Sequence, residues 1–142
     1  IQGNPSVLQN VGDVTSYGFE AAGTFTIVDD VILFASYAYN DSQYDDNVVD
    51  ADGNVTPTKD KTVVDSPKHL LKAELVYDDD SFFAKAGVTY MSKRYYTFLN
   101  DGAVGGRALL DLSVGYRFSG SPWLDGLVVQ LNVSNLTNKK YV

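Results

Sequence analysis

The chain has 142 residues, a formal net charge of −7, 13% aromatic residues and no cysteine. The acidic balance argues against a nucleic-acid-binding protein, which needs a basic face, and a chain without cysteine offers no disulfide, thiolate metal site or catalytic thiol. No window approaches the roughly 18 apolar residues of a transmembrane helix, and residues 1–10 lack the basic and apolar regions of a signal peptide.

The first two predicted strands cover residues 14–28 and 31–43. In each, apolar and aromatic side chains recur at every second position, which indicates a β-strand with one apolar face. Asp29 and Asp30 form a short polar pair between the strands and predict a tight turn. The apolar side carries Tyr17, Phe19, Ala21, Gly23, Phe25 and Ile27 in the first strand, and Val31, Leu33, Ala35, Tyr37 and Tyr39 in the second.

A second pair of strands is predicted at residues 67–77 and 81–95. A long polar segment, residues 44–66, precedes this pair, and a short run of three aspartates at 78–80 joins its members. A loop rich in glycine and small polar residues follows at 97–106. Connections therefore alternate between long polar segments and short acidic turns.

The last two strands are predicted at residues 107–118 and from residue 127 onward, with a turn between them. The sixth strand shows the alternation clearly: Leu127, Val129, Leu131 and Val133 lie on one face, and Val128, Gln130, Asn132 and Ser134 on the other. The chain is therefore predicted to be all-β, with about six antiparallel strands.

Three features favour a transmembrane β-barrel. The predicted strands have about 12–15 residues, against about 5 or 6 in soluble sheets and about 9–11 for a tilted bilayer crossing. Short turns alternate with long loops, as in bacterial outer-membrane barrels. Outward aromatic residues gather near both strand ends, as the girdles of such barrels do. They are Tyr17, Phe19, Tyr39 and Tyr90 on the long-loop side, and Phe25, Tyr77, Phe82, Tyr116 and Phe118 on the short-turn side.

Six strands are too few to close a membrane barrel, because such barrels start at about eight strands. An open edge in lipid would leave backbone amides unpaired, at a cost of several kcal/mol each. We therefore expect a segment of a larger barrel; a barrel assembled from several copies of this chain is the alternative.

The face opposite the apolar one is polar and is predicted to line the barrel lumen. Its charged and amide residues are Glu20, Lys72, Glu74, Lys85, Asp111, Arg117 and Gln130. In a soluble β-sandwich the same face would meet bulk water, and periodicity alone does not separate the two arrangements. The carboxylates on this face are expected to form ion pairs across the strands or to contact a plug, in preference to acid–base catalysis.

The long loops supply the candidate ligand-facing residues, because external loops carry recognition in such proteins. These candidates are Asp45, Asp46, Asp50, Asp52, Asn54, Asn100 and Asp101. The acidic cluster also suggests calcium, but it lacks the spacing of an EF-hand, so we expect a solvated loop and no metal site. His69 is the only histidine and gives zinc or nucleophilic chemistry little to build on. No catalytic residue and no cofactor are expected.

The segment Arg94–Tyr95–Tyr96 admits two interpretations. Its rings could stack on a sugar or siderophore, or they could belong to the interfacial girdle with a basic anchor. The second interpretation is preferred.

The end of the chain, NLTNKKY at residues 135–141, resembles a signature near the C-terminal end of TonB-dependent outer-membrane receptors. Further segments resemble the same family in the same order, and their combined order and spacing are more specific than any one of them. They are GDVTSYGFEA at 12–21, SYAYNDSQY at 36–44, SPKHLLKAELVY at 66–77 and MSKRYYTFLND at 91–101.

The resemblance implies a 22-strand barrel filled by an N-terminal plug, with residues 1–142 as the C-terminal portion of the barrel. The plug, the TonB box and the final strand are expected to be absent from these residues. The implied function is high-affinity uptake of a scarce nutrient such as a ferric siderophore, another metal complex or a carbohydrate, and not catalysis. The implied partners are outer-membrane lipid or lipopolysaccharide, the plug, the TonB complex and a small-molecule ligand; the implied location is the outer membrane of a Gram-negative bacterium.

Three alternatives remain open at this point. A soluble β-sandwich or small barrel could act as a binding module. Several copies could assemble one pore, or the chain could belong to a passive porin.

Overall fold

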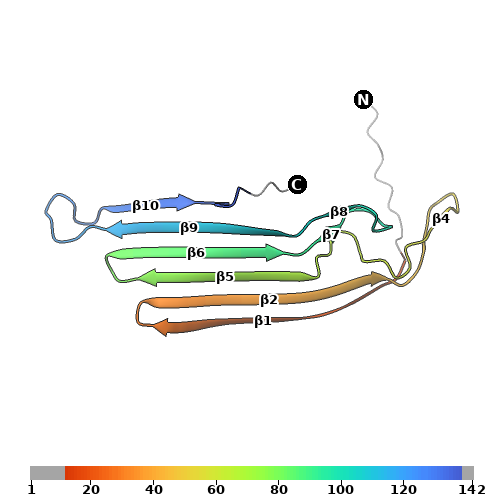
Figure 1. The fold of residues 1–142 in the computed structure, drawn as a ribbon, viewed down its shortest axis with the longest axis horizontal. Coiled ribbons are helices and arrows are strands. Elements are labelled where there is room, and N and C mark those ends of the chain that lie inside the picture. Colours follow the sequence, from red (N-terminus) through yellow and green to blue (C-terminus); the bar gives the residue numbers. More distant parts are fainter. Residues whose placement is uncertain (1–11, 139–142) are drawn as a thin grey trace, which may run out of the picture.

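The computed structural model describes residues 12–138, which form one antiparallel sheet of six long strands (Figure 1). The spatial order β1-β2-β5-β6-β9-β10 follows the chain, so each long strand pairs with the next. The strands are β1 (Val14–Val28), β2 (Val31–Tyr44), β5 (His69–Asp78), β6 (Phe82–Met91), β9 (Arg107–Arg117) and β10 (Val128–Val133). The all-β antiparallel fold expected from the alternation is confirmed.

Short turns join the strands at one end of the sheet. Asp30 and Asp80 have φ angles of 65° and 71°, a left-handed conformation that aspartate tolerates better than most residues. The carboxylate of Asp79 accepts hydrogen bonds from the amides of Ser81 and Phe82 at 3.2 and 2.7 Å. These bonds hold the pKa of Asp79 below its ordinary value. The aspartates therefore build the turns that the sequence predicted.

The long connections at the other end contain two small sheets. One is the hairpin of β3 (Val48–Val49) and β4 (Val55–Thr56), and the other pairs β7 (Arg94–Tyr95) with β8 (Ala103–Val104). The fourth predicted strand is shorter than expected, because the chain leaves the main sheet after Met91 and pairs as β7 instead. The third begins at His69 and not at Pro67, since proline has no amide to donate to a sheet.

The strand register assigns every side chain of the main sheet to one of two faces. Residues paired across neighbouring strands point to the same face, as Tyr17 and Asp41 do in β1 and β2, and Leu71 and Tyr90 in β5 and β6. The predicted apolar residues share one face, and they are exposed there: Tyr17 by 59% and Leu112 by 38%. The apolar face is thus not the core of a sandwich within residues 12–138, and an exposed apolar surface marks a site of contact with a membrane or with further protein.

Aromatic side chains form contacts near both ends of the apolar face. At the loop end, the rings of Phe19 and Tyr39 lie 6.0 Å apart. At the turn end, Tyr77 lies 5.9 Å from Phe82, and Tyr116 lies 4.9 Å from Phe118. Small residues such as Ala73 and Ala86 occupy the middle, so the face has two aromatic girdles around an aliphatic band.

The sheet is open within residues 12–138, because β1 and β10 each have a neighbour on one side only. An open sheet is what a segment of a larger barrel shows. The described residues contain no helix of sufficient length and hydropathy to cross a membrane.

Candidate functional site

The polar face carries all seven residues predicted to line a lumen, and the register places them on the same side of the sheet. Lys85 on β6 and Glu74 on β5 form an ion pair of 3.0 Å there. A hollow of about 330 Å³ lies beside this pair and includes Lys72, Asp111 and Ser113 in its lining. Both signs of charge and several hydroxyl groups therefore meet in the middle of the polar face.

Two further predicted residues make hydrogen bonds near the β9–β10 edge. Asp111 accepts a hydrogen bond from the amide of Asn135 at 2.9 Å. The side-chain amide of Gln130 donates to Ser113 Oγ at 2.9 Å and to Asn132 Oδ1 at 2.8 Å. These bonds fix the orientation of the polar side chains, so the face has a defined hydrogen-bonding pattern.

Arg117 lies at the turn end of the polar face, and it pairs with Asp78, which is not one of the three carboxylates predicted for this face, Glu20, Glu74 and Asp111. The guanidinium makes two bonds to Asp78, at 2.7 and 2.9 Å, and donates a third to the Asp80 carbonyl at 3.2 Å. It also lies 4.4 Å from the ring centre of Phe83, which covers Gly115. A bidentate arginine pair of this kind closes the turn end by tying β9 to the end of β5.

We call the long connections between β2 and β5 (residues 45–68) and between β6 and β9 (residues 92–106) the first and second external loops, after the side of the barrel expected for them from the sequence. The first external loop has a small core of its own. Tyr44, Val48 and Thr58 are 2%, 2% and 0% exposed, and they are the most deeply buried side chains of the described residues. The Thr58 hydroxyl donates to the Asp46 carbonyl at 2.9 Å and accepts from the Val48 amide at 2.8 Å. This loop is therefore folded and not merely solvated.

Asp50 organises the β3–β4 turn within this loop. Its carboxylate accepts hydrogen bonds from the side chain and the amide of Asn54, at 2.9 and 2.8 Å, and from the Asp52 amide at 2.9 Å. These bonds hold the pKa of Asp50 below its ordinary value. Asp50 and Asn54, two of the predicted ligand-facing residues, thus bond to each other, while Asp52 remains exposed.

The second external loop is bonded to the first. The Asn100 side chain accepts from the Thr62 amide at 2.8 Å and donates to the Thr62 carbonyl at 2.9 Å. Arg94 and Asp65 add an ion pair of 3.2 Å between the same two loops. The loops therefore form one connected external surface, on which the predicted residues Asp45, Asp46 and Asp101 are exposed.

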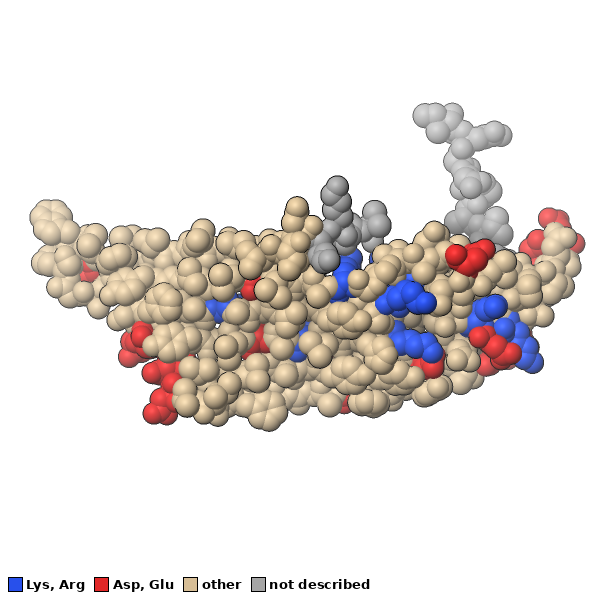
Figure 2. All heavy atoms as spheres, viewed as in Figure 1, with Lys and Arg blue, Asp and Glu red and all other residues tan. Residues whose placement is uncertain are grey.

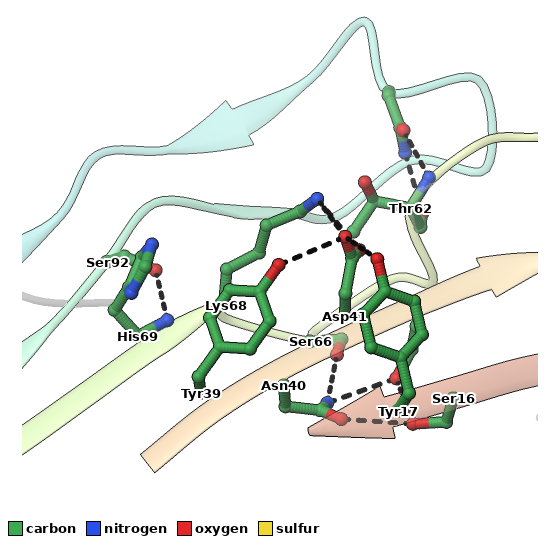
Figure 3. Close-up of polar contacts among 12 residues, drawn as sticks. Ser16, Tyr17, Tyr39, Asn40, Asp41, Thr62, Ser66, Lys68, His69 and Ser92 are labelled. Atoms are coloured by element: carbon green, nitrogen blue, oxygen red, sulfur yellow. Dashed lines mark hydrogen bonds and ion pairs between the residues drawn. The ribbon is translucent and has the colours of Figure 1, made fainter. Parts of the chain in front are cut away.

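Sequence reasoning missed a polar cluster on the opposite, apolar face (Figure 3). Lys68 contacts both carboxylate oxygens of Asp41, at 2.7 and 2.8 Å, and the hydrogen bond raises the pKa of Lys68. The hydroxyls of Tyr17 and Tyr39 also point to Asp41, at 3.2 and 3.4 Å. The hydroxyls of the girdle residues Tyr17 and Tyr39 thus contact the Asp41–Lys68 ion pair at the loop end of the sheet. The available signal was the alternation of β2, which places Asp41 on the same face as Tyr37 and Tyr39.

The segment Arg94–Tyr95–Tyr96 lies in the external loop beyond the girdle residue Tyr90, so its preferred assignment to the girdle is not supported. Arg94 pairs with Asp65, and Lys93 donates to the Tyr95 hydroxyl at 2.9 Å. No group of three or more acidic or histidine side chains converges as a metal site within residues 12–138. The signature residues Lys139, Lys140 and Tyr141 lie outside the described residues.

Comparison with known proteins gives consistent matches over nearly the whole chain. Residues 1–136 match the family described as TonB dependent receptor-like, beta-barrel. The chain is 32% identical over 139 residues to the ferrioxamine B receptor of Salmonella typhimurium and 32% identical over 135 residues to the ferrioxamine receptor of Yersinia enterocolitica. These alignments cover 94% and 92% of this chain but only 19% and 18% of the relatives.

A solved structure has the same fold. The siderophore receptor PiuA from Acinetobacter baumannii superposes on 98% of this chain with a TM-score of 0.75, at 24% sequence identity. The alignment covers 20% of that receptor. At this identity, the match establishes the shared fold of the strands.

Proposed function

Because this chain belongs to the TonB-dependent receptor β-barrel family, we propose that it forms part of the wall of an outer-membrane receptor for a ferric siderophore of the ferrioxamine type. The observation that carries the proposal is the 32% identity to ferrioxamine receptors over 94% of the chain. The relatives are named as receptors and not as enzymes, in agreement with the expectation from the sequence.

The two faces of the sheet support this role. The apolar face with its two girdles would meet lipid, and the polar face around Glu74 and Lys85 would line the lumen. In an intact receptor, this lining would contact a plug domain, which the family implies. The balanced charges on the polar face suit contact with another polar surface, because Glu74 and Lys85 already neutralise each other.

The two external loops would form part of the ligand entrance. Their hydrogen bonds through Asn100 make them one surface, and a pre-organised surface loses less entropy on binding than two mobile loops. Asp46, Asp52 and Asp101 are the exposed candidates for ligand contact. Captured ligand would then move inward when TonB engages the receptor, as the family implies. Residues 1–142 would belong to the C-terminal part of the barrel, as the NLTNKKY segment indicates.

Uptake of iron as a siderophore complex tests the proposal. The complete natural gene is expressed in a bacterium that lacks its own ferrioxamine receptors, and uptake of radioactive iron as ferrioxamine B is measured. We expect TonB-dependent uptake, and we expect none of it from a ferric catecholate supplied in parallel. Uptake of neither complex, or uptake that persists without TonB, would contradict the proposal. Fractionation of the cells gives an independent test of the outer-membrane location.

A further inference from the structure

The connection between β9 and β10, residues 118–127, carries Trp123, the most exposed large apolar side chain within residues 12–138. Trp123 is 93% exposed, and Leu124 and Leu127 on the same connection are 41% and 45% exposed. The connection projects past the two shorter turns at this end of the sheet (Figure 1). Apolar side chains that are grouped and exposed on one projecting segment indicate an interaction site.

Backbone hydrogen bonds hold this connection, so the exposed position of Trp123 is fixed. The Ser121 carbonyl accepts a hydrogen bond from the Asp125 amide at 2.9 Å, which closes one helical turn around Trp123. At the base of the connection, the Phe118 amide donates to the Leu127 carbonyl at 2.8 Å. A pre-organised segment loses less conformational entropy on binding, and tryptophan is among the residues that contribute most to protein interfaces.

The turn end of the sheet is also strongly acidic. The described turns and strand ends there carry six exposed aspartates and one arginine, Arg117, whose guanidinium is already bound to a carboxylate. In Figure 2, acidic side chains gather at this end, on the left, and most basic side chains lie toward the loop end. A binding partner with basic side chains would be attracted to this surface. The six aspartates are Asp29, Asp30, Asp78, Asp79, Asp80 and Asp125.

A membrane surface does not suit Trp123. Segments that anchor a protein at a membrane interface combine aromatic residues with Lys and Arg, which attract anionic headgroups, whereas Trp123 is accompanied by aspartates. The aromatic girdle at this end is also formed without Trp123, since the rings of Tyr116 and Phe118 contact each other at 4.9 Å. Both observations favour a soluble protein as the partner.

We propose that the turn end of the sheet is a docking surface for a soluble periplasmic protein with a basic face, and that Trp123 inserts into an apolar pocket of that protein. This inference rests on the proposed function, because the short turns of an outer-membrane barrel face the periplasm. Trp123 and Leu124 form the apolar centre of the surface, and Asp80 and Asp125 belong to its charged rim. The surface lies at the opposite end of the sheet from the external loops, so its contact is separate from ligand capture.

Photo-crosslinking in living cells tests the surface. The complete receptor carries benzoylphenylalanine in place of Trp123, and a control receptor carries it in place of Tyr96, an aromatic residue that is 65% exposed at the loop end. We expect an adduct with one basic soluble protein from position 123 and none with that protein from position 96. Asp80→Asn combined with Asp125→Asn should remove most of the adduct, because the rim then loses two charges.

The affinity of the captured protein, once purified, is then measured with the complete receptor in detergent. Trp123→Ala is expected to weaken binding about thirtyfold, the effect of a tryptophan at the centre of an interface. Trp123→Phe should retain part of the affinity, and Tyr96→Ala should leave it unchanged. Because Trp123 is almost fully exposed, its replacement leaves the packing of the sheet intact.

Four results would overturn the proposal. They are an adduct with lipid alone, adducts with many proteins that persist without the two aspartates, an adduct that disappears in cells lacking TonB, and equal affinity of Trp123→Ala and the natural receptor. Uptake of ferrioxamine B by the natural receptor is measured in the same cells. Absence of uptake refutes the receptor function, whereas normal uptake without a protein adduct refutes only the docking surface.

Discussion

Asp41 and Lys68 form an ion pair that joins the loop end of β2 to the residue before β5, with both carboxylate oxygens within 2.8 Å of the ammonium. The carboxylate is enclosed, since Asp41 is 5% exposed, and two tyrosine hydroxyls point to it. The Lys68 side chain is 38% exposed. The pair thus combines one sheltered and one half-exposed charge on the apolar face.

Replacing only Lys68 should cost more than replacing both members of the pair. Lys68→Gln leaves the Asp41 carboxylate without its counter-charge, whereas Lys68→Gln with Asp41→Asn leaves two neutral amides. We expect a coupling free energy between Lys68 and Asp41 of about 1 kcal/mol. It is smaller than for a fully buried pair because Lys68 is partly solvated. Guanidinium unfolding of the receptor in lipid vesicles measures it. If the double variant is as unstable as the sum of the two single variants, the pair contributes nothing.

Gly18→Ala should destabilise the external half of β1. A Cβ at Gly18 would overlap the carbonyl oxygen of Tyr39, a backbone atom fixed by the sheet. We expect a loss of about 2 kcal/mol in the free energy of unfolding, typical of overpacking. Gly87→Ala is the matched control, because its Cβ would lie 4.0 Å from the nearest atom, the Ala73 carbonyl oxygen, on the same face of the sheet. Equal stability of the two variants would argue against the close approach at Gly18.

Asn100→Ala should separate the two external loops. The change removes both hydrogen bonds to Thr62, and alanine also fits poorly at the left-handed φ of 58° that Asn100 adopts. We expect a broader distance distribution between spin labels at Asp52 and Asp101, and a loss of about 1–3 kcal/mol from two hydrogen bonds. Asn54→Ala, which alters bonds within the first loop only, should leave the distribution between loops narrow. Unchanged distances between the labels in Asn100→Ala would show that the two Asn100–Thr62 hydrogen bonds, the Asn100–Thr62 clamp, do not hold the loops together.

The alternation along the strands was sufficient to predict the two faces, because a period of two assigns each residue of a strand to a side. Ala21 and Ala22 illustrate this. Ala21 pairs with Tyr37 on the apolar face, and Ala22 pairs with Ser36 on the polar face. The Asn100–Thr62 clamp was not predictable, since it joins residues 38 positions apart and leaves no local pattern. The folded hairpin beside Thr58 was also missed. Its polar composition indicated a solvated loop, and nothing in the sequence showed that the Thr58 hydroxyl is buried.

The β3–β4 turn should loosen in acid. The folded-state pKa of Asp50 lies below the ordinary value of 3.8, so its hydrogen bonds stabilise the turn above that pH. The stabilisation is lost as pH falls through the lower, folded-state pKa. Amide exchange at Asp52 and Asn54, corrected for intrinsic rates, should therefore be constant from pH 7 to pH 5 and accelerate below about pH 3.8. Asp50→Asn should remove this pH dependence; if it persists there, another group is responsible.

The orientation of the sheet can be tested with one pair of adjacent alanines. Ala21 is the middle residue of β1 on the apolar face, and Ala22 follows it on the polar face. Ala21→Arg would place a guanidinium near the bilayer centre, at a cost of about 2–4 kcal/mol. Ala22→Arg would place the same group at nearly the same depth but in the lumen, where water and carboxylates such as Glu20 can accommodate it. Unfolding from lipid vesicles compares the two variants. Because residue type, strand and depth are matched, a large cost at Ala22 with none at Ala21 would reverse the assignment of the two faces.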